Sequence, residues 1–337
     1  MDLLEKLIST FGVSGNEQKV RNLIQSEIRR YVDEVYVDKV GNLIAHKKGI
    51  KPRIMLSAHM DEIGLMIKSI DSCGRIFFSE LGGADTVMFL GERVHIETKK
   101  GSIHGVITTR EVNDGSFITQ IPKLEELFVD TGLSQDELKK LGVEVGSYLS
   151  LERDLYHLGS EKIICGKAFD DRIGCYILIE LAKRMKKSKG EIYFVFTIQE
   201  EIGLVGAMTS AFIVEPDWAI AVDTMETCDA KGGEPMITIG GGPFITIKDA
   251  QMIGDKTLND YLTKIAKKKK INIQKDVSDI GTTDAASISI TKGGVPSTVI
   301  GTAIRNLHTA TAVANIDDIK NTIVILEEFL KNPPKGR

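Results

Sequence analysis

The sequence predicts an α/β fold built around an open β-sheet. Three short apolar segments, at residues 54–58, 194–198 and 218–222, have the β-branched and aromatic composition of buried strands. Each is followed closely by acidic side chains, and stretches with helical spacing lie between them in the chain. Because ligand sites of open α/β sheets lie outside the carboxyl ends of their strands, we expect these acids to meet at one edge.

The length and composition are those of a soluble globular protein. The chain has 337 residues, enough for about two domains, with 42% hydrophobic and 27% charged residues and a net charge of −4. Nothing indicates a nucleic-acid partner. The basic run at residues 267–270 lies at the end of a predicted helix, and we interpret it as solvent-exposed surface. No stretch approaches the roughly 20 apolar residues of a membrane span. The first residues lack the pattern of a signal peptide.

Cysteine usage indicates a reducing, cytoplasmic environment. Four cysteines are scattered without Cys-x-x-Cys spacing, so we expect most of them to act as small buried hydrophobic residues and not to form disulfides. They are Cys73, Cys165, Cys175 and Cys228. No histidine partner lies near Cys165 or Cys175 in sequence, so a cysteine nucleophile is not indicated.

The N-terminal segment predicts two helices, a hairpin and a strand. The helices occupy residues 1–31 and are separated by a glycine-containing turn, and residues 35–46 have a hairpin pattern. The strand at residues 54–58 ends at His59 and Asp61. Residues at i and i+2 of an extended segment share a face, so Asp61 could accept the second ring N–H of His59, as in a metal site. Alone, the pattern also fits a hydrogen-bonded core histidine beside a turn aspartate.

The pattern changes from about residue 68 to residue 155. Short β-like segments punctuated by glycine predict a compact, mostly β module. We interpret residues 67–156 as an insertion into a larger domain made of residues 1–66 and 157–337. His95 and His104 lie in this module without an acidic pattern around them, so we expect structural or surface roles.

The remaining segments continue the alternation of strands and helices. The segment that ends in Asp170, Asp171 and Arg172 precedes a helical apolar pattern, and helices are also predicted at residues 258–270 and 315–330. The glycine run at residues 240–242 lacks the strand–loop–helix context of a phosphate-binding loop. Nucleotide binding is therefore not expected.

The strand ends and adjacent loops contribute a set of imidazole and carboxylate groups. The set comprises His59, Asp170, Glu200, Glu201, Asp223 and His308. An isolated Glu200-Glu201 pair could simply open the next helix, where acids suit the positive end of the dipole. Together the six residues have the ligand composition of a Zn²⁺ or similar divalent site. Their number suits two ions that share a bridging carboxylate and a bridging water.

Six ordered segments resemble the tetrahedral aminopeptidases, dinuclear metallopeptidases that are also filed as glutamyl aminopeptidases or cellulases. The segments are HMDEIG at 59–64, KAFDDR at 167–172, QEEIG at 199–203, VD at 222–223, GTTDA at 281–285 and LHT at 307–309. The resemblance covers essentially the whole chain. It implies a mixed-sheet, three-layer α/β catalytic domain like that of zinc peptidases, with an inserted small β-rich dimerisation domain.

The resemblance also implies a role for each site residue. Asp170 would bridge two divalent ions, Zn or Co; His59 and Asp223 would complete one coordination sphere, and Glu201 and His308 the other. Glu200 would be the general base that activates the metal-bridged water, and Asp61 would orient His59. Asp171 and Arg172 would support the bridging residue, with a cis peptide between Asp170 and Asp171. A loop with Thr282, Thr283 and Asp284 would shape the substrate pocket.

The implied activity is release of N-terminal amino acids from peptides. In the family, the insert pairs subunits, and dimers assemble into a hollow dodecamer. One departure is found at residues 105–110, GVITTR, where relatives usually carry a Pro-Pro-His segment. The departure concerns the oligomer contacts and the pocket wall that this module would provide. We expect the metal site to be unaffected. The preferred N-terminal residue does not follow from the sequence.

Three alternative functions remain open at this stage. A glycoside hydrolase also uses paired acids, but its carboxylates face each other across a sugar at about 5–10 Å. A deacylase or dipeptidase of the same fold could use identical metal ligands. A non-catalytic assembly protein would have no need of the intact Glu200. Chelator sensitivity and substrate panels distinguish these alternatives.

Overall fold

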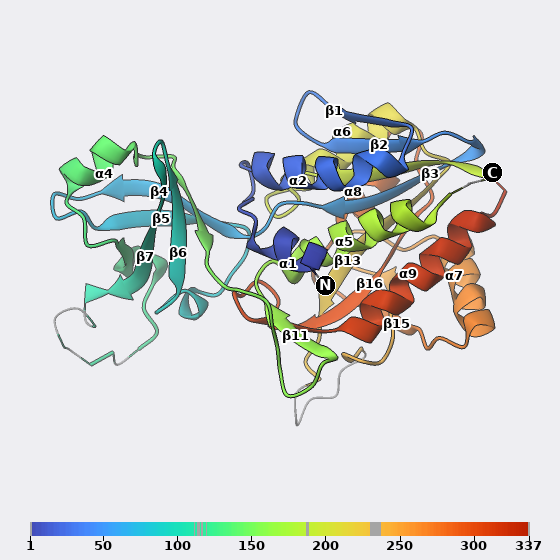
Figure 1. Ribbon diagram of the computed structural model, residues 1–337. Coiled ribbons are helices and arrows are strands. Elements are labelled where there is room, and N and C mark those ends of the chain that lie inside the picture. The colour runs from blue at the N-terminus through green and yellow to red at the C-terminus, as the bar shows by residue number, and fades with distance from the viewer. Residues whose placement is uncertain are drawn as a thin grey trace.

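A mixed β-sheet is the centre of the larger part of the protein (Figure 1). The computed structural model describes residues 2–110, 112, 115, 117–118, 120–186, 189–229 and 237–335. Within them the sheet has 11 strands. Nine follow the order β1 (Glu34–Val37), β2 (Leu43–Lys47), β12 (Gly190–Thr197), β3 (Ile50–His59), β13 (Trp218–Glu226), β16 (Ser297–Arg305), β17 (Ala312–Asn315), β11 (Ile163–Gly166) and β10 (Tyr156–His157).

The four central strands of this sheet run in parallel. Strand β3 pairs in parallel with β12 and β13, and β13 pairs in parallel with β16. The flanking strands β2 and β17 are antiparallel to them, and β14 (Phe244–Lys248) joins β15 (Gln274–Val277) to β16. The carboxyl ends of β12, β3 and β13 therefore lie at one edge, as expected from the sequence. The predicted hairpin is the antiparallel pair β1 and β2.

Helices cover both faces of the sheet and make three layers. One face carries α1 (Asp2–Ser9), α2 (Gln18–Ile28), the 3₁₀ turn η1 (Arg29–Tyr31), α5 (Phe169–Arg184), α7 (Lys256–Lys269) and α9 (Ile316–Lys331). The other carries α6 (Val205–Val214) and α8 (Asp284–Ser289). Alternation along β2 shows the two faces, because Leu43 and Ala45 pack with the first group and Ile44 with the second. The three-layer prediction is confirmed.

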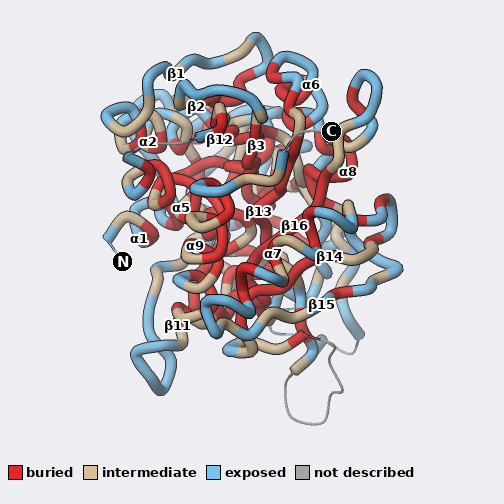
Figure 2. Tube along the Cα trace, turned by 90° about the vertical axis from the view of Figure 1, so that its right-hand side faces the viewer, coloured by how far each residue is buried: buried red, intermediate tan, exposed pale blue. Residues whose placement is uncertain are grey.

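The central strands are buried on both faces, which explains their continuous apolar runs. Figure 2 shows β13 and β16 almost entirely buried between the helical layers. Helix α9 begins where Asn315 Oδ1 accepts a hydrogen bond from the Asp317 N–H, at 2.8 Å. Among the described helices, none is both long enough and apolar enough to cross a lipid bilayer.

A closed antiparallel barrel forms the smaller part and lies to one side of the sheet (Figure 1). Its strands follow the order β4 (Gly64–Ile70), β5 (Ile76–Leu81), β8 (Leu127–Asp130), β7 (Gly101–Thr109), β6 (Arg93–Thr98) and β9 (Tyr148–Leu151). Three short helical segments accompany them: η2 (Thr86–Met88), η3 (Leu124–Glu126) and α4 (Gln135–Leu141). The barrel has its own apolar core, so the predicted β-rich module is present. The domain boundaries at residues 67 and 156 and the dimerisation role stay predictions.

Candidate metal centre

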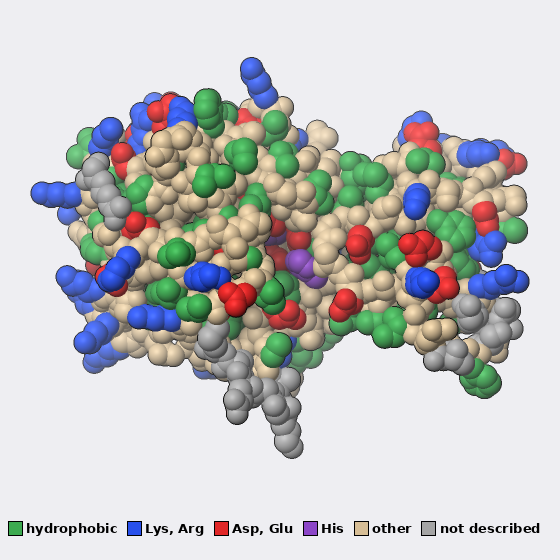
Figure 3. All heavy atoms as spheres, turned by 180° about the vertical axis from the view of Figure 1, so that it is seen from behind, with side chains coloured by type: hydrophobic (Ala, Val, Ile, Leu, Met, Phe, Trp, Pro, Cys, Tyr) green, Lys and Arg blue, Asp and Glu red, His purple; other side chains and the backbone are tan. Residues whose placement is uncertain are grey.

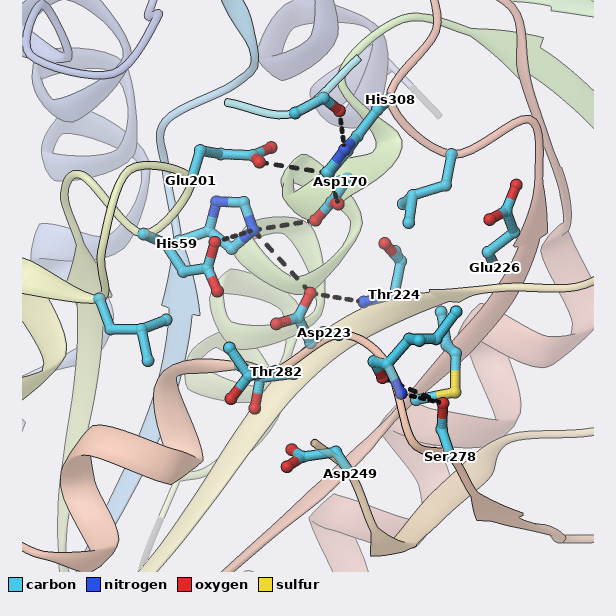
Figure 4. A pocket seen from close by; sticks show the side chains of 18 of the residues that line it. His59, Asp170, Glu201, Asp223, Thr224, Glu226, Asp249, Ser278, Thr282 and His308 are labelled. Atoms are coloured by element: carbon cyan, nitrogen blue, oxygen red, sulfur yellow. Dashed lines mark hydrogen bonds and ion pairs between the residues drawn. The ribbon is translucent and has the colours of Figure 1, made fainter. Parts of the chain in front are cut away.

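The six candidate ligand and base residues lie together where the central strands end (Figure 4). His59 is the last residue of β3, and Asp223 lies within β13. Glu200 and Glu201 follow β12, Asp170 lies at the start of α5, and His308 follows β16. Parallel pairing of β12, β3 and β13 accounts for their meeting, because it brings segments far apart in sequence to one sheet edge.

The first ligand cluster consists of His59, Asp170 and Asp223. His59 Nε2 lies 2.8 Å from Asp170 Oδ1 and 3.9 Å from Asp223 Oδ1. One ligand atom from each residue lies within 4.8 Å of the other two. One imidazole nitrogen and two carboxylate oxygens form a suitable donor set for Zn²⁺ or Co²⁺.

The second ligand cluster consists of Asp170, Glu201 and His308. His308 Nε2 lies 3.3 Å from Asp170 Oδ2 and 3.2 Å from Glu201 Oε2. The other ring nitrogen of His308 contacts the carbonyl oxygen of Gly83, which fixes the imidazole from the barrel side. Asp170 is common to both clusters and directs one carboxylate oxygen to each histidine.

Asp61 contacts more groups of the site than His59, the one partner that the sequence predicts for it. Its Oδ1 is 3.5 Å from His59 Nδ1, and its backbone oxygen is 3.1 Å from the same ring nitrogen. Its carboxylate also accepts hydrogen bonds from the backbone N–H groups of Glu200 and Glu201, at 3.1 and 3.2 Å, and from the Ser14 hydroxyl at 2.7 Å. Asp61 therefore holds the glutamate pair as well as the histidine.

Asp171 and Arg172 lie directly behind Asp170. The Asp170-Asp171 peptide bond is cis. Asp171 Oδ1 accepts a hydrogen bond from the Gly174 N–H at 2.9 Å. The fully buried Arg172 donates to the carbonyl oxygens of Leu7, Thr10 and Gly12, so it ties α5 to the end of α1.

Sequence reasoning assigned no role to a buried ion pair that borders both ligand segments. Lys167 Nζ donates to both carboxylate oxygens of Glu62, at 2.8 and 2.6 Å, and to the Ser150 hydroxyl at 2.9 Å. Glu62 adjoins Asp61, Lys167 lies three residues before Asp170, and Ser150 belongs to strand β9 of the barrel. The signal available in the sequence was a charged residue shortly after an apolar segment, because a charge that becomes buried needs a partner.

Carboxylates are crowded at this site, and the pKa values of its acids and histidines reflect that crowding. Burial, followed by the neighbouring acids Asp223 and Glu201, raises the pKa of Glu200 well above its usual range. Burial works to lower the pKa of His308, but hydrogen bonds to Asp170 and Glu201 raise it to about 11. Among the described residues, the buried Glu201 Oε1 has no hydrogen-bond partner. Divalent cations would replace protons here and use this oxygen, so the residues present fit a metal site.

A cavity of about 600 Å³ opens in front of the two clusters. Figure 3 shows a histidine and several acidic side chains in a hollow near the junction with the barrel. Thr282 and Thr283, predicted as pocket residues, line the cavity. Asp284 is not among the lining residues. It is buried and accepts a hydrogen bond from the Thr197 hydroxyl at 2.6 Å.

Comparisons with known proteins show the family of the chain. The sequence model of the M42 glutamyl aminopeptidase family matches residues 41–325. A lysyl aminopeptidase of Pyrococcus furiosus is 33% identical over 98% of this chain and 96% of the relative. An aminopeptidase structure from the archaeon Desulfurococcus kamchatkensis has a TM-score of 0.94 and 35% identity, covering 98% of this chain and 94% of that chain.

A further solved structure, the TET1 peptidase of Pyrococcus horikoshii, has a TM-score of 0.89 and 30% identity, and the match covers 98% of this chain and 99% of that chain. That peptidase can assemble into a tetrahedron or a large octahedral shell. The resemblance drawn from the sequence motifs is thereby confirmed. With the family match extending over most of its length, the chain belongs to the M42 glutamyl aminopeptidase family and is a metallo-aminopeptidase, a hydrolase of peptide bonds.

Proposed function

We propose that the chain removes N-terminal amino acids from peptides at a site holding two divalent ions, Zn or Co. Asp170 would bridge the ions, with His59 and Asp223 on one and Glu201 and His308 on the other. The observation that carries the proposal is that two ligand clusters share one carboxylate, with an oxygen directed to each histidine. When bound, the ions would make water more acidic and polarise the scissile carbonyl group.

Glu200 is the general base in this proposal. Its carboxylate belongs to neither ligand cluster, but its Oε2 lies 3.9 Å from His59 Nε2 at the cavity wall. It would accept a proton from the attacking water and deliver it to the leaving amine. Asp61 would keep Glu200 in place through the backbone N–H contacts, so the base would move little during proton transfer.

N-terminal selectivity would follow from binding of the free α-amino group at one ligand cluster. Only the first peptide bond would then come within reach of Glu200. A deacylase or dipeptidase could use the same residues, and the names of the family and of a relative differ in the residue released, glutamyl in one and lysyl in the other. A panel of aminoacyl, N-acyl and dipeptide substrates separates these activities.

A glycoside hydrolase is less well supported by the same geometry. Both histidines contact the carboxylates directly, at 2.8 to 3.3 Å, which suits shared metal ligation. A pair of glycosidase acids must instead leave room for a sugar between them. Activity on a glucan that persists in the presence of a chelator would contradict the peptidase proposal.

The decisive experiment compares Glu200→Gln with the unchanged protein on aminoacyl p-nitroanilides. Loss of the base should lower kcat by roughly a hundredfold or more, while bound metal stays at two ions per chain. Glu215→Gln, at an exposed glutamate paired with Lys292, is the matched control and should keep full turnover. Chelation should abolish activity, and Zn²⁺ or Co²⁺ should restore it. Unchanged turnover of the Glu200 variant would exclude this mechanism.

We also propose that the chain forms a cytoplasmic homo-oligomer in which barrel-mediated dimers assemble into a dodecamer. Support comes from the assemblies of the Pyrococcus horikoshii relative. Phe117 and Ile121 also support it, because these apolar side chains, which follow β7 in the barrel part, are 92% and 69% exposed in the single chain. Enclosure in such a shell would limit substrates to peptides able to enter it.

A further inference from the structure

We infer that the substrate cavity selects a basic N-terminal residue, lysine or arginine, through an acidic wall formed by Asp249 and Asp276. The inference rests on the proposed function, since it requires that the first residue of a peptide occupies this cavity. It goes beyond that function because neither the family name nor the metal ligands determine which side chain is accepted.

The acidic wall lies away from the metal ligands. Asp249 directly follows β14, and Asp276 belongs to β15, so both come from the part of the sheet that branches from β16. Both line the cavity that also contains His59 and His308. Figure 4 shows Asp249 on the far side of Asp223 from His308. A residue bound by its α-amino group at the ligand clusters could therefore direct its side chain toward this wall.

The two carboxylates are buried, and no ion pair joins either of them to a cationic side chain among the described residues. Asp249 is 3% exposed and Asp276 is 4% exposed. Within the described residues, neither Asp249 Oδ2 nor Asp276 Oδ2 has a hydrogen-bond partner. Burial, followed by the nearby Asp249 charge, raises the pKa of Asp276. An uncompensated buried charge is costly, so a cation entering the cavity would stabilise the pair.

Asp249 also has a local structural role. Its Oδ1 accepts hydrogen bonds from the backbone N–H groups of Gln251 and Met252, both at 2.7 Å. This turn accounts for one carboxylate oxygen only. Among the described residues, no backbone N–H group donates a hydrogen bond to the Asp276 carboxylate. The local turn therefore does not explain why both carboxylates are buried here.

The charges around the cavity are unbalanced even when two metal ions are included. Seven carboxylates line it, and Asp170, Glu200, Glu201 and Asp223 belong to the proposed metal chemistry. Glu226, Asp249 and Asp276 remain, and no lysine or arginine is found among the described lining residues. The nearby Lys248 pairs with Asp279, at 2.8 Å. The resulting negative potential would attract a cationic side chain and repel a glutamyl one.

The apolar lining suits the remainder of a lysine or arginine side chain. Met225, Ile280 and Leu307 line the same cavity. Long basic side chains place their methylene stems along apolar surface and their charged heads against carboxylates. A glutamyl side chain would bring a third negative charge to the two unpaired ones.

The test compares substrates that differ mainly in side-chain charge. With the metal-loaded, full-length protein, kcat/KM is measured for lysyl, norleucyl, arginyl, citrullinyl and glutamyl p-nitroanilides. Norleucine keeps the linear stem of lysine and lacks the ammonium group. We expect lysine to exceed norleucine by roughly tenfold or more, because charged hydrogen bonds contribute that much, and glutamate to be poorest.

Two variants connect the preference to the acidic wall. Asp276→Asn and Asp249→Asn remove a negative charge each, and asparagine at position 249 can still accept the hydrogen bonds of the turn. Each should reduce the lysine-to-norleucine ratio several-fold, as loss of one charged partner predicts. Asp279→Asn is the matched control, because this carboxylate is exposed and already paired with Lys248, and it should keep the ratio.

Calorimetry with free L-lysine and L-norleucine provides a binding readout that does not require turnover. Equal kcat/KM for lysyl and norleucyl substrates, or an unchanged ratio in both wall variants, would overturn the inference while leaving the aminopeptidase proposal intact. Tighter binding of L-lysine with no release from any substrate would instead overturn the proposed function and support the acidic wall.

Discussion

At the scale of single residues, Asp61 shows how one carboxylate can hold several groups of the candidate site. The sequence indicates only its possible contact with His59, whereas the structure adds the backbone of Glu200 and Glu201 and the hydroxyl of Ser14. These partners come from three separate parts of the chain. A charged acceptor with several hydrogen bonds is well satisfied in the interior, which explains a fully buried aspartate here.

Asp284 leads to a prediction about pH. Burial raises its pKa to about 6, although the Thr197 hydroxyl stabilises the ionised form. An unfolded aspartate ionises near pH 3.9, so the folded state binds the extra proton between about pH 4 and 6. Stability should fall as pH rises through this window, by up to about 3 kcal/mol, and stay lowered above it.

The variant Asp284→Asn should remove this penalty. Urea unfolding of the chelated, metal-free protein should give a higher free energy of unfolding for the variant at pH 8, with little difference at pH 4. Asp260→Asn, at an exposed position paired with Lys256, is the control. An equal effect of Asp284→Asn at both pH values would show that its ionisation is not responsible.

At the scale of elements, the approach of α5 to β13 determines where Asp170, shared by the two ligand clusters, lies relative to Asp223. Gly174 permits this approach. A Cβ at this position would lie 2.4 Å from the carbonyl oxygen of Val222 and 2.3 Å from Asp171 Oδ2. The backbone of β13 cannot move aside cheaply, so only glycine allows the observed spacing.

Gly174→Ala should therefore push α5 away from β13. We expect a loss of about 1–3 kcal/mol in the free energy of unfolding, as for other overpacked positions. Metal affinity should also fall, because Asp170 would move relative to Asp223. Urea unfolding and metal titration measure the two effects. Gly293→Ala is the control, since outside its chain neighbours no atom of the described part of the chain lies within 4 Å of its added Cβ, and it should leave both quantities unchanged.

At the scale of the whole molecule, the barrel contributes to the site as well as to the proposed assembly. Gly83, in the loop after β5, contacts His308, and Ser150 of β9 contacts the Glu62–Lys167 ion pair. Both contacts join the barrel to segments that carry ligand residues. The position of the barrel and the geometry of the metal site are therefore linked.

The proposed assembly predicts the effect of a charge on the barrel surface. Phe117→Asp should lower the oligomer mass measured by light scattering, because an exposed aromatic side chain at an interface would be replaced by a charge. Ile253→Asp, at an apolar side chain on the larger part that is 78% exposed, is the control and should preserve the assembly. An unchanged mass for Phe117→Asp would place the interface elsewhere.

The sequence by itself determined the strands, most helices and which side chains would be candidates for the site. The apolar run at residues 194–197 has the composition of a buried strand, and it lies in strand β12. The acidic residues that follow it can be recognised from the local sequence alone. The motif order was also sufficient to indicate the family.

Only the tertiary structure decided which groups meet. Asp249 and Asp276 line one cavity, Asp61 contacts the Glu200 backbone, and Glu62 pairs with Lys167, although each of these partners lies far away in the sequence. Local pattern predicts that a charge exists, but its partner depends on how strands are ordered and how closely helices pack. For the same reason Asp284, in the predicted pocket loop, is buried behind the cavity wall rather than among its lining residues.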